Sequence, residues 1–274
     1  VTLIGDVYEG ARRNAVMGVN SSTIGTGAAL YPLIGGGLAG IRWNVPFFFF
    51  GIGILVAVVA VVALPEPEGT EPDDIRTYLG GLSRVITSPQ PLVIFAAIFV
   101  VFFVFYGAVQ TAIPLLLNDE FGLSSGQIGL TLSMVALASA VVSSQYGRIS
   151  KWRSGPELIA LGFVAYGCSL IGVWLAPSPV FVGVSLLAFG VGFGLVMPSI
   201  DTTIVTAVSD RLRAGMMGMR TSVLRLGQTV GPIAFTALAE NAFPTPTAGY
   251  RVLLVAFGVG ILAAGVIAYP LLRN

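Results

Sequence analysis

The feature that most constrains this sequence is a succession of apolar blocks, each about 20 residues long. A block of that length crosses the hydrocarbon core of a bilayer as an α-helix. Glycine, proline and charged residues separate the blocks, which predicts an all-α protein whose helices cross a membrane. The eight predicted spans are residues 15–39, 44–64, 91–117, 125–147, 156–176, 179–206, 214–239 and 250–272.

Composition argues against the main alternative, a soluble bundle of buried helices. Only 10% of the 274 residues are charged and 55% are hydrophobic, whereas a soluble domain carries about 25% charged residues. So few charged side chains cannot cover a water-exposed surface of this size. The net charge of +1 gives no indication of nucleic-acid binding. We therefore expect the lipid bilayer to surround the chain.

The residues that usually carry catalysis and metal binding are scarce. The chain has no histidine and one cysteine, Cys168, so neither an internal disulfide nor a metal–thiolate cluster is expected. A Gly-Lys phosphate-binding loop is also absent from the sequence. We expect no enzyme activity, no cofactor and no metal. Without histidine, any proton carrier inside the membrane has to be a carboxylate.

The connections between the predicted spans differ in charge. Ten basic residues fall in one alternate set of connections and at the chain ends, whereas the other set holds only Arg42 and Arg251. Basic loops stay on the cytoplasmic side. This predicts a multi-pass protein of the cell membrane with both ends of this chain in the cytoplasm. The ten residues are Arg12, Arg13, Arg76, Arg84, Arg148, Lys151, Arg153, Arg211, Arg213 and Arg273.

The first two predicted spans resemble the last two, mostly at an offset of 200 residues. Four spans lie between the copies, so the copy interval is six helices, which predicts two six-helix halves with four helices preceding this chain. The predicted parts are 1–64, the last two helices of the N-terminal bundle; 65–90, a cytoplasmic linker with an amphipathic segment; and 91–274, the C-terminal bundle. The aligned pairs include Gly18 with Gly218, Gly27 with Gly227, and Pro32 with Pro232.

Residues 18–36, GVNSSTIGTGAALYPLIGG, resemble the fifth-helix antiporter motif of the major facilitator superfamily (MFS), with Tyr31 where the motif has glycine. Residues 40–55 and 118–130 resemble other family segments, and 192–218 is similar to the tenth helix of drug-efflux members. The resemblance implies helices five to twelve of a monomeric twelve-helix (6+6) transporter. The motif residues in the first copy are Gly18, Gly27, Pro32, Gly35 and Gly36, and those in the second are Gly218, Gly227, Gly231 and Pro232.

These glycines and prolines support two interpretations. Glycine lets helix backbones approach closely in lipid, and proline removes a backbone hydrogen bond and permits a kink. The motif residues therefore indicate either a tightly packed helix pair or, beyond that, a seam that opens and closes during alternating access.

Arg225 lies about ten residues into the seventh span, roughly 15 Å deep at 1.5 Å per residue. A charge at that depth is costly and should face protein or a water-filled cavity. Thr221 and Gln228 share its helix face. We hypothesise that this stripe contacts an anionic or hydrogen-bonding group of a substrate; the alternative is a structural pair with a carboxylate or backbone carbonyls. Tyr106 and Gln110, one turn apart in the third span, are further cavity candidates.

Asp201 is the clearest carboxylate inside a predicted span, and Arg220 should lie at a similar depth in the next helix. A plain ion pair is one interpretation, and a protonation switch for proton coupling is the other. With the family resemblance, these features favour a secondary transporter for proton-coupled efflux of small molecules. The alternatives are a metabolite or sugar porter of the same fold, and a membrane sensor or scaffold that does not transport.

Overall fold

The computed structural model describes residues 23, 26–27, 30–63, 89–207 and 210–273, and every regular element among them is helical, as the sequence predicts. Gly18 and nearly all of the predicted linker 65–90 lie outside these residues. A helix Leu30–Ile41 comes first. The further elements are α3 (Val45–Phe49), α4 (Ile52–Ala63), α6 (Pro89–Val104), η1 (Phe105–Ala112), α7 (Ile113–Phe121), α8 (Ser125–Ile149), α9 (Gly155–Leu175), α10 (Pro179–Ala207), α11 (Asp210–Ala242) and α12 (Pro246–Arg273).

Six stretches of the described chain are long and apolar enough to cross a membrane. They correspond to the second to sixth and the eighth predicted spans. Within the first predicted span, the described apolar helix Leu30–Ile41 is shorter. The seventh span is α11, which is long but carries Arg220 and Arg225 in its middle part. Charged residues such as these, six in all within the bounds of α11, lower its hydropathy.

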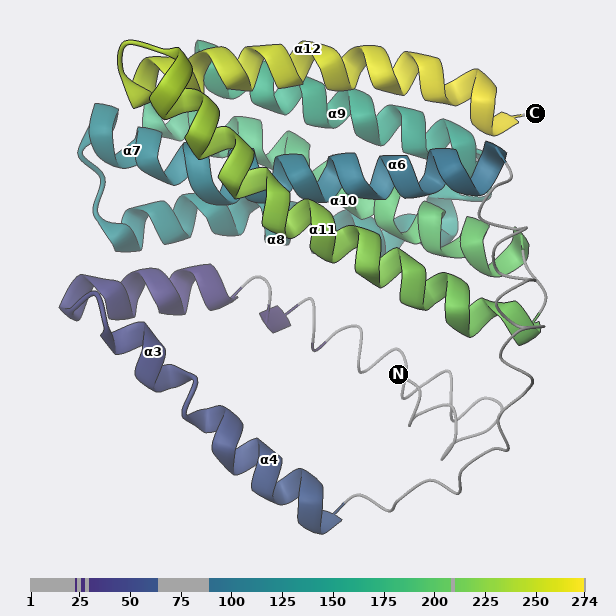
Figure 1. Cartoon of the computed structure of the whole chain (residues 1–274), viewed down its shortest axis with the longest axis horizontal. Helices are drawn as coiled ribbons and strands as arrows, with labels where there is room; N and C mark the ends of the chain where they lie inside the picture. The colour runs from purple at the N-terminus through teal and green to yellow at the C-terminus, as the bar shows by residue number, and fades with distance from the viewer. Residues whose placement is uncertain (1–22, 24–25, 28–29, 64–88, 208–209, 274) are drawn as a thin grey trace.

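The helices alternate in direction, so the connections fall at two ends of the molecule (Figure 1). The α7–α8 and α11–α12 connections lie at the left-hand end with the turn before α3, whereas the end of α10, the start of α11 and the end of α12 lie at the right-hand end. The two predicted sets of connections are thus separated in space. Which end faces the cytoplasm stays a prediction, based on the basic residues alone.

The starts of α8 and α9 follow from local sequence. Ser124 and Ser154 each cap a helix, and the residues three positions later, Gln127 and Glu157, return a bond to the cap in a capping box. Before α8, Gly122 adopts a left-handed conformation with φ of 64° and ends α7. These caps explain why the predicted starts of the fourth and fifth spans, 125 and 156, lie within one residue of the observed ones.

The C-terminal bundle packs through glycines that meet helix backbones. A Cβ at Gly192 of α10 would lie 2.6 Å from the carbonyl oxygen of Gly162 in α9, and a Cβ at Gly258 of α12 would lie 3.2 Å from that of Gly167. Such approaches need residues without side chains, which is how helices associate in lipid. Through these approaches α9 packs on both α10 and α12.

The second predicted span is not a continuous helix. Phe50 and Gly51 form a turn between α3 and α4, in which the N–H groups of both residues donate to carbonyls three positions earlier. None of the apolar window Val45–Val62 is buried in this structure. This segment therefore differs from the other five membrane-length stretches, each of which is partly buried inside the structure.

Candidate functional site

The helix Leu30–Ile41 meets the first turns of α8 along most of its length, in a contact that we call the seam, formed by Pro32, Gly36, Gly40, Ser125 and Gly129. A Cβ at Gly36 would lie 2.5 Å from the Ser125 carbonyl oxygen, and one at Gly129 would collide with the Pro32 carbonyl. A Cβ at Gly40 would lie 3.7 Å from Ser125 Oγ. The seam therefore joins two backbones with no side chain between them at its tightest points.

The seam includes only part of the predicted motif. Pro32 and Gly36 take part, whereas a Cβ at Gly35 would meet nothing within 4 Å. Gly27 faces the ring of Tyr31, which also contacts Phe49 edge-on at 6.4 Å between centroids. The partner residues on α8 were not predicted. The small residues in the stretch 124–129, SSGQIG, are the signal that would have indicated them.

In the second copy the motif glycines pack within the C-terminal bundle instead. A Cβ at Gly227 would lie 2.8 Å from the Phe99 carbonyl oxygen of α6, and Gly231 lies against Phe103 and Gly107. Gly218, in contrast, has nothing within 4 Å of a built Cβ. Pro232 lies inside α11.

The third span contains a π-helical segment, η1, which the sequence analysis did not anticipate. Ile113 donates its N–H to the Ala108 carbonyl, five residues back, and Thr111 Oγ1 donates to the Tyr106 carbonyl at 2.8 Å. The segment ends at Ala112, two residues before Pro114, which has no N–H to donate. π-helical turns are frequent at functional sites, and both cavity candidates of this span, Tyr106 and Gln110, lie in η1.

The two residues differ in environment. Tyr106 is half-buried and contacts the rings of Phe102 and Phe105, with centroids 6.4 and 5.2 Å away. Gln110 is exposed. Because Gly231 is level with Gly107, and Arg225 lies six residues earlier, Arg225 is roughly 9 Å further along the axis toward the start of α11. The structure therefore places the η1 pair and the Arg225 stripe at different depths.

Arg225 lies in the middle of α11 and is exposed, with its Nη1 donating to Gln228 Oε1 at 2.9 Å. Thr221 Oγ1 donates to the Met217 carbonyl at 2.9 Å. The structure thus brings Arg225 and Gln228 together on one face, as their spacing predicts, and the Thr221 hydroxyl is bonded to its own helix.

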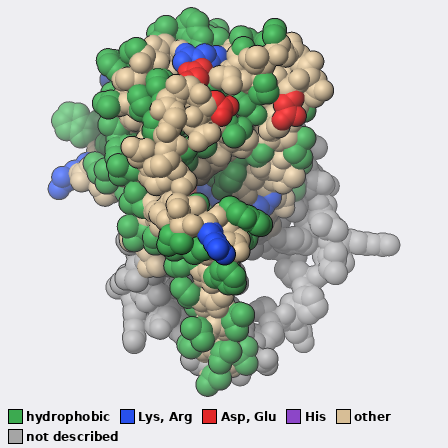
Figure 2. All heavy atoms as spheres, turned by 90° about the vertical axis from the view of Figure 1, so that its left-hand side faces the viewer, with side chains coloured by type: hydrophobic (Ala, Val, Ile, Leu, Met, Phe, Trp, Pro, Cys, Tyr) green, Lys and Arg blue, Asp and Glu red, His purple; other side chains and the backbone are tan. Residues whose placement is uncertain are grey.

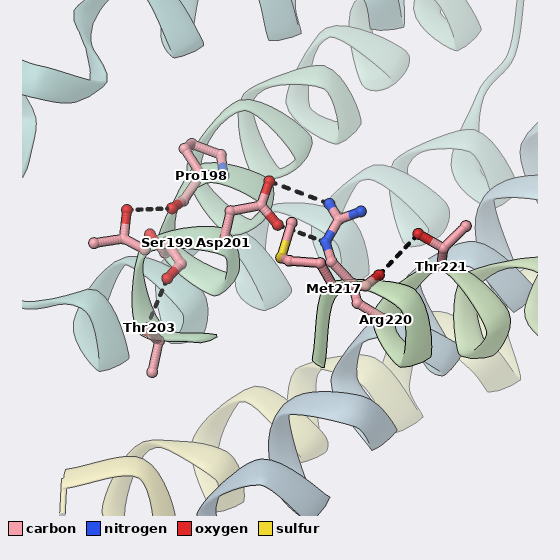
Figure 3. A network of polar contacts seen from close by, with 8 residues as sticks. Pro198, Ser199, Asp201, Thr203, Met217, Arg220 and Thr221 are labelled. Carbon is pink, nitrogen blue, oxygen red and sulfur yellow. Dashed lines mark hydrogen bonds and ion pairs between the residues drawn. The ribbon is translucent and has the colours of Figure 1, made fainter. Parts of the chain in front are cut away.

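Asp201 and Arg220 meet between α10 and α11 (Figure 3). Arg220 Nε lies 2.5 Å from Asp201 Oδ1, and Nη2 donates to Oδ2 at 3.2 Å. The Arg220 side chain is 16% exposed and that of Asp201 is 41% exposed. The carboxylate is therefore neutralised by its partner, and the Asp201 side chain is partly exposed although its Oδ1 is buried.

Near this ion pair, Pro198 interrupts the backbone hydrogen bonding of α10. Its ring nitrogen has no hydrogen, so the Gly194 carbonyl loses its usual helical donor. Ser143 of α8 donates its hydroxyl to that carbonyl at 3.4 Å. A side chain from a neighbouring helix thus replaces the missing bond, as membrane helices require.

A second ion pair, which the sequence analysis did not predict, joins three helices at the α7 end. Arg251 of α12 donates Nε to Glu120 Oε1 at 2.6 Å, contacts Glu120 Oε2 through Nη2, and donates Nη1 to the Trp174 carbonyl of α9 at 2.8 Å. Acidic and basic side chains gather on this face of the bundle (Figure 2). Within the described residues, no group of three His, Cys, Asp or Glu is placed to hold a metal ion.

Comparison with known proteins shows the family. The Major Facilitator Superfamily model matches residues 1–232 and, in an overlapping match, residues 94–274. The chain therefore belongs to the major facilitator superfamily, a family of multi-pass membrane transporters.

Several curated proteins are similar to the chain. Multidrug resistance protein 1 of Bacillus subtilis (strain 168) is 24% identical over 84% of this chain and 59% of its own length. The staphyloferrin B transporter of Staphylococcus aureus is 22% identical over 91% and 61%. The class G tetracycline resistance protein of Vibrio anguillarum is 25% identical over 86% and 61%. The chain thus spans about three fifths of the length of these relatives.

A solved structure has the same fold. It is the inward-facing, unoccupied crystal structure of a bacterial homolog of the human lysosomal transporter Spinster, with a TM-score of 0.76 and 17% identity. The match covers 99% of this chain and 73% of that one.

Proposed function

We propose that this chain is part of a secondary transporter that exports small molecules across the cell membrane by alternating access. The observation that carries the proposal is the seam. It joins the two predicted halves through glycine and carbonyl contacts at the first turns of α8, and no ion pair of the described residues crosses it. Such a contact can separate at little cost, because no charged pair has to be broken. The family and the export functions in the names of its relatives support the same conclusion.

A cysteine cross-link tests whether the seam must open. Gly40 and Ser125 are suitable because a Cβ at Gly40 would lie 3.7 Å from Ser125 Oγ, close to disulfide geometry. In a Cys168→Ala background, we expect oxidation of the Gly40→Cys/Ser125→Cys full-length protein to lower transport in proteoliposomes at least about tenfold, and reductant to restore it. The two single-cysteine variants are the controls. An unchanged rate in fully cross-linked protein would show that the seam need not open.

We also propose that Asp201 carries the coupling proton. Protonation would remove its charge and weaken the contact with Arg220, which joins α10 to α11. The 41% exposure of Asp201 leaves a route for the proton. The ion pair would then hold one arrangement of the two helices and release it when the proton binds.

Replacement of the carboxylate tests the coupling. We expect Asp201→Asn to abolish substrate accumulation driven by a proton gradient, because the amide takes no proton, while exchange without a gradient continues. Glu157→Gln is the matched control, since Glu157 pairs with Arg153 at 3.8 Å at the start of α9. Equal accumulation by Asp201→Asn and unmodified protein would exclude Asp201 as the proton carrier.

A further inference from the structure

We propose that Arg225 and Gln228 form a recognition site for a carboxylate of the transported molecule. The inference rests on the proposed transport function and gives the chemistry of its substrate. It follows from three observations on α11: the donors that the pair presents, the bonding of the neighbouring hydroxyl groups, and the position of the described carboxylates.

The pair presents more hydrogen-bond donors than acceptors. A guanidinium has five N–H donors and no acceptor, so the side-chain oxygen of Gln228 has to face Arg225. That oxygen accepts from Nη1 at 2.9 Å, which turns the amide NH₂ of Gln228 away from the contact. The remaining guanidinium donors and the amide donors suit a ligand that brings acceptor oxygens.

The nearby hydroxyl groups leave this charge unbalanced. Ser222 and Thr229 lie beside Arg225 on the exposed side of α11 and donate to carbonyls of their own helix, those of Gly218 and Arg225, at 3.2 and 3.0 Å. Their hydrogens are thus engaged within the helix, and a neutral hydroxyl cannot offset a positive charge. The site therefore combines one positive charge with polar, uncharged surroundings.

Among the carboxylates whose side chains the structure describes, none forms an ion pair with Arg225. Asp201 is engaged by Arg220. Asp119 and Glu120 lie near the end of α7, and Glu240 lies fifteen residues from Arg225, roughly 22 Å along α11. An arginine in the middle of a membrane helix is costly without a partner. A substrate carboxylate that binds both side chains would supply the missing negative charge.

A second pair of arginine and glutamine, Arg148 with Gln145, provides a control for the proposed site. Arg148 Nη1 donates to Gln145 Oε1 at 3.0 Å with the same spacing of three residues. That pair lies in the last turn of α8, where arginine is favoured by the helix dipole and meets water. Pairing with glutamine therefore does not distinguish Arg225 from Arg148. What distinguishes Arg225 is its position in the middle of a helix.

Two dyes that share a fused-ring scaffold test the proposal. Fluorescein carries a carboxylate, whereas rhodamine 6G is a cationic ester. In fluorescence anisotropy with purified full-length protein, we expect fluorescein to bind more tightly than rhodamine 6G. Arg225→Gln should weaken fluorescein binding at least about tenfold, as expected for hydrogen bonds to a charged group. Arg225→Lys should weaken it less, because charge remains but the fork of donors is lost. Arg148→Gln should change nothing.

A second variant keeps the test decisive if Arg225→Gln does not fold. Gln228→Glu places a carboxylate against the guanidinium and should weaken fluorescein binding to a similar extent. Fluorescein affinity within about twofold of the unmodified protein in either folded variant would overturn the proposal, as would tighter binding of rhodamine 6G or no fluorescein binding at all. A variant that loses thermal stability but keeps its fluorescein affinity would show that Arg225 pairs inside the protein. Intact fluorescein binding through Arg225 without any transport would contradict the proposed function alone.

Discussion

The two copies of the repeated helix pair share their glycines but not their surroundings. In the second copy, Gly227 lies against the backbone of α6, and Gly258 lies against Gly167 of α9. In the first copy, Gly27 meets only the ring of Tyr31. At this pair of aligned positions, glycine therefore marks a tight backbone crossing in the second copy and only a side-chain contact in the first, where the tight crossing lies at Gly36 instead.

The difference teaches what a glycine in a membrane helix specifies. It removes the side chain that would keep another backbone away, so it permits a close crossing. It does not select the partner, because the contact also depends on the residues that the facing helix brings. The aligned positions of the two copies can therefore be compared directly by substitution.

The largest effect is expected at the aligned pair Gly227 and Gly27. A Cβ at Gly227 would lie 2.8 Å from a backbone carbonyl, so Gly227→Val should lower the free energy of unfolding by about 3 kcal/mol or more. A Cβ at Gly27 would meet the side chain of Tyr31, which is 62% exposed and can rotate away. Gly27→Val should cost less than about 1 kcal/mol. Thermal unfolding in detergent measures both, and equal losses would remove the distinction between the copies.

An intermediate effect is expected at Arg251 and Arg42, the basic residues of the less basic set of connections. Arg251 joins Glu120 and the Trp174 carbonyl, so Arg251→Gln should lower the free energy of unfolding by about 1.5–3 kcal/mol. Arg42 is exposed, and Arg42→Gln should stay within about 0.5 kcal/mol of the unmodified protein. The unfolding temperature of each variant is the measurement. A loss of stability in Arg42→Gln as large as that in Arg251→Gln would show that Arg42 also joins its helix to a neighbouring one.

The smallest effect is expected at Gly260 and its counterpart Gly53. A built Cβ meets nothing within 4 Å at either position. Alanine is the better helix former, so Gly260→Ala should be neutral or stabilise by up to about 1 kcal/mol, and Gly53→Ala should behave likewise. Destabilisation by Gly53→Ala alone would mean that α4 packs against a further helix, and the comparison would then be between two packed copies.

Much of the fold could be predicted from the chain. The fifth span was predicted at 156–176 and observed at Gly155–Leu175, because Ser154, Pro156 and the apolar run act locally. The π-helical segment η1 was missed, since it depends on the packing of Gly107 against α11 as well as on Pro114. Local signals locate a helix, whereas its internal irregularities also depend on neighbours.

The candidate site shows the same division. The meeting of Asp201 with Arg220 could be anticipated from their similar depths in consecutive helices. The pair of Glu120 with Arg251 could not, because the residues lie 131 positions apart and nothing local links them. The proximity of Gly129 to Pro32 also had no signal beyond a cluster of small residues.

By itself, the sequence determined that the chain lies in lipid as helices that run back and forth, because apolar blocks of this length leave backbone groups no partners except those within a helix. Only the tertiary structure decided which glycines form crossings and which charges meet. Those contacts depend on how the helices are rotated about their axes and on how far each is shifted along its neighbour. Many combinations of rotation and shift satisfy the same apolar pattern, and only side-chain and backbone fit between helices selects one.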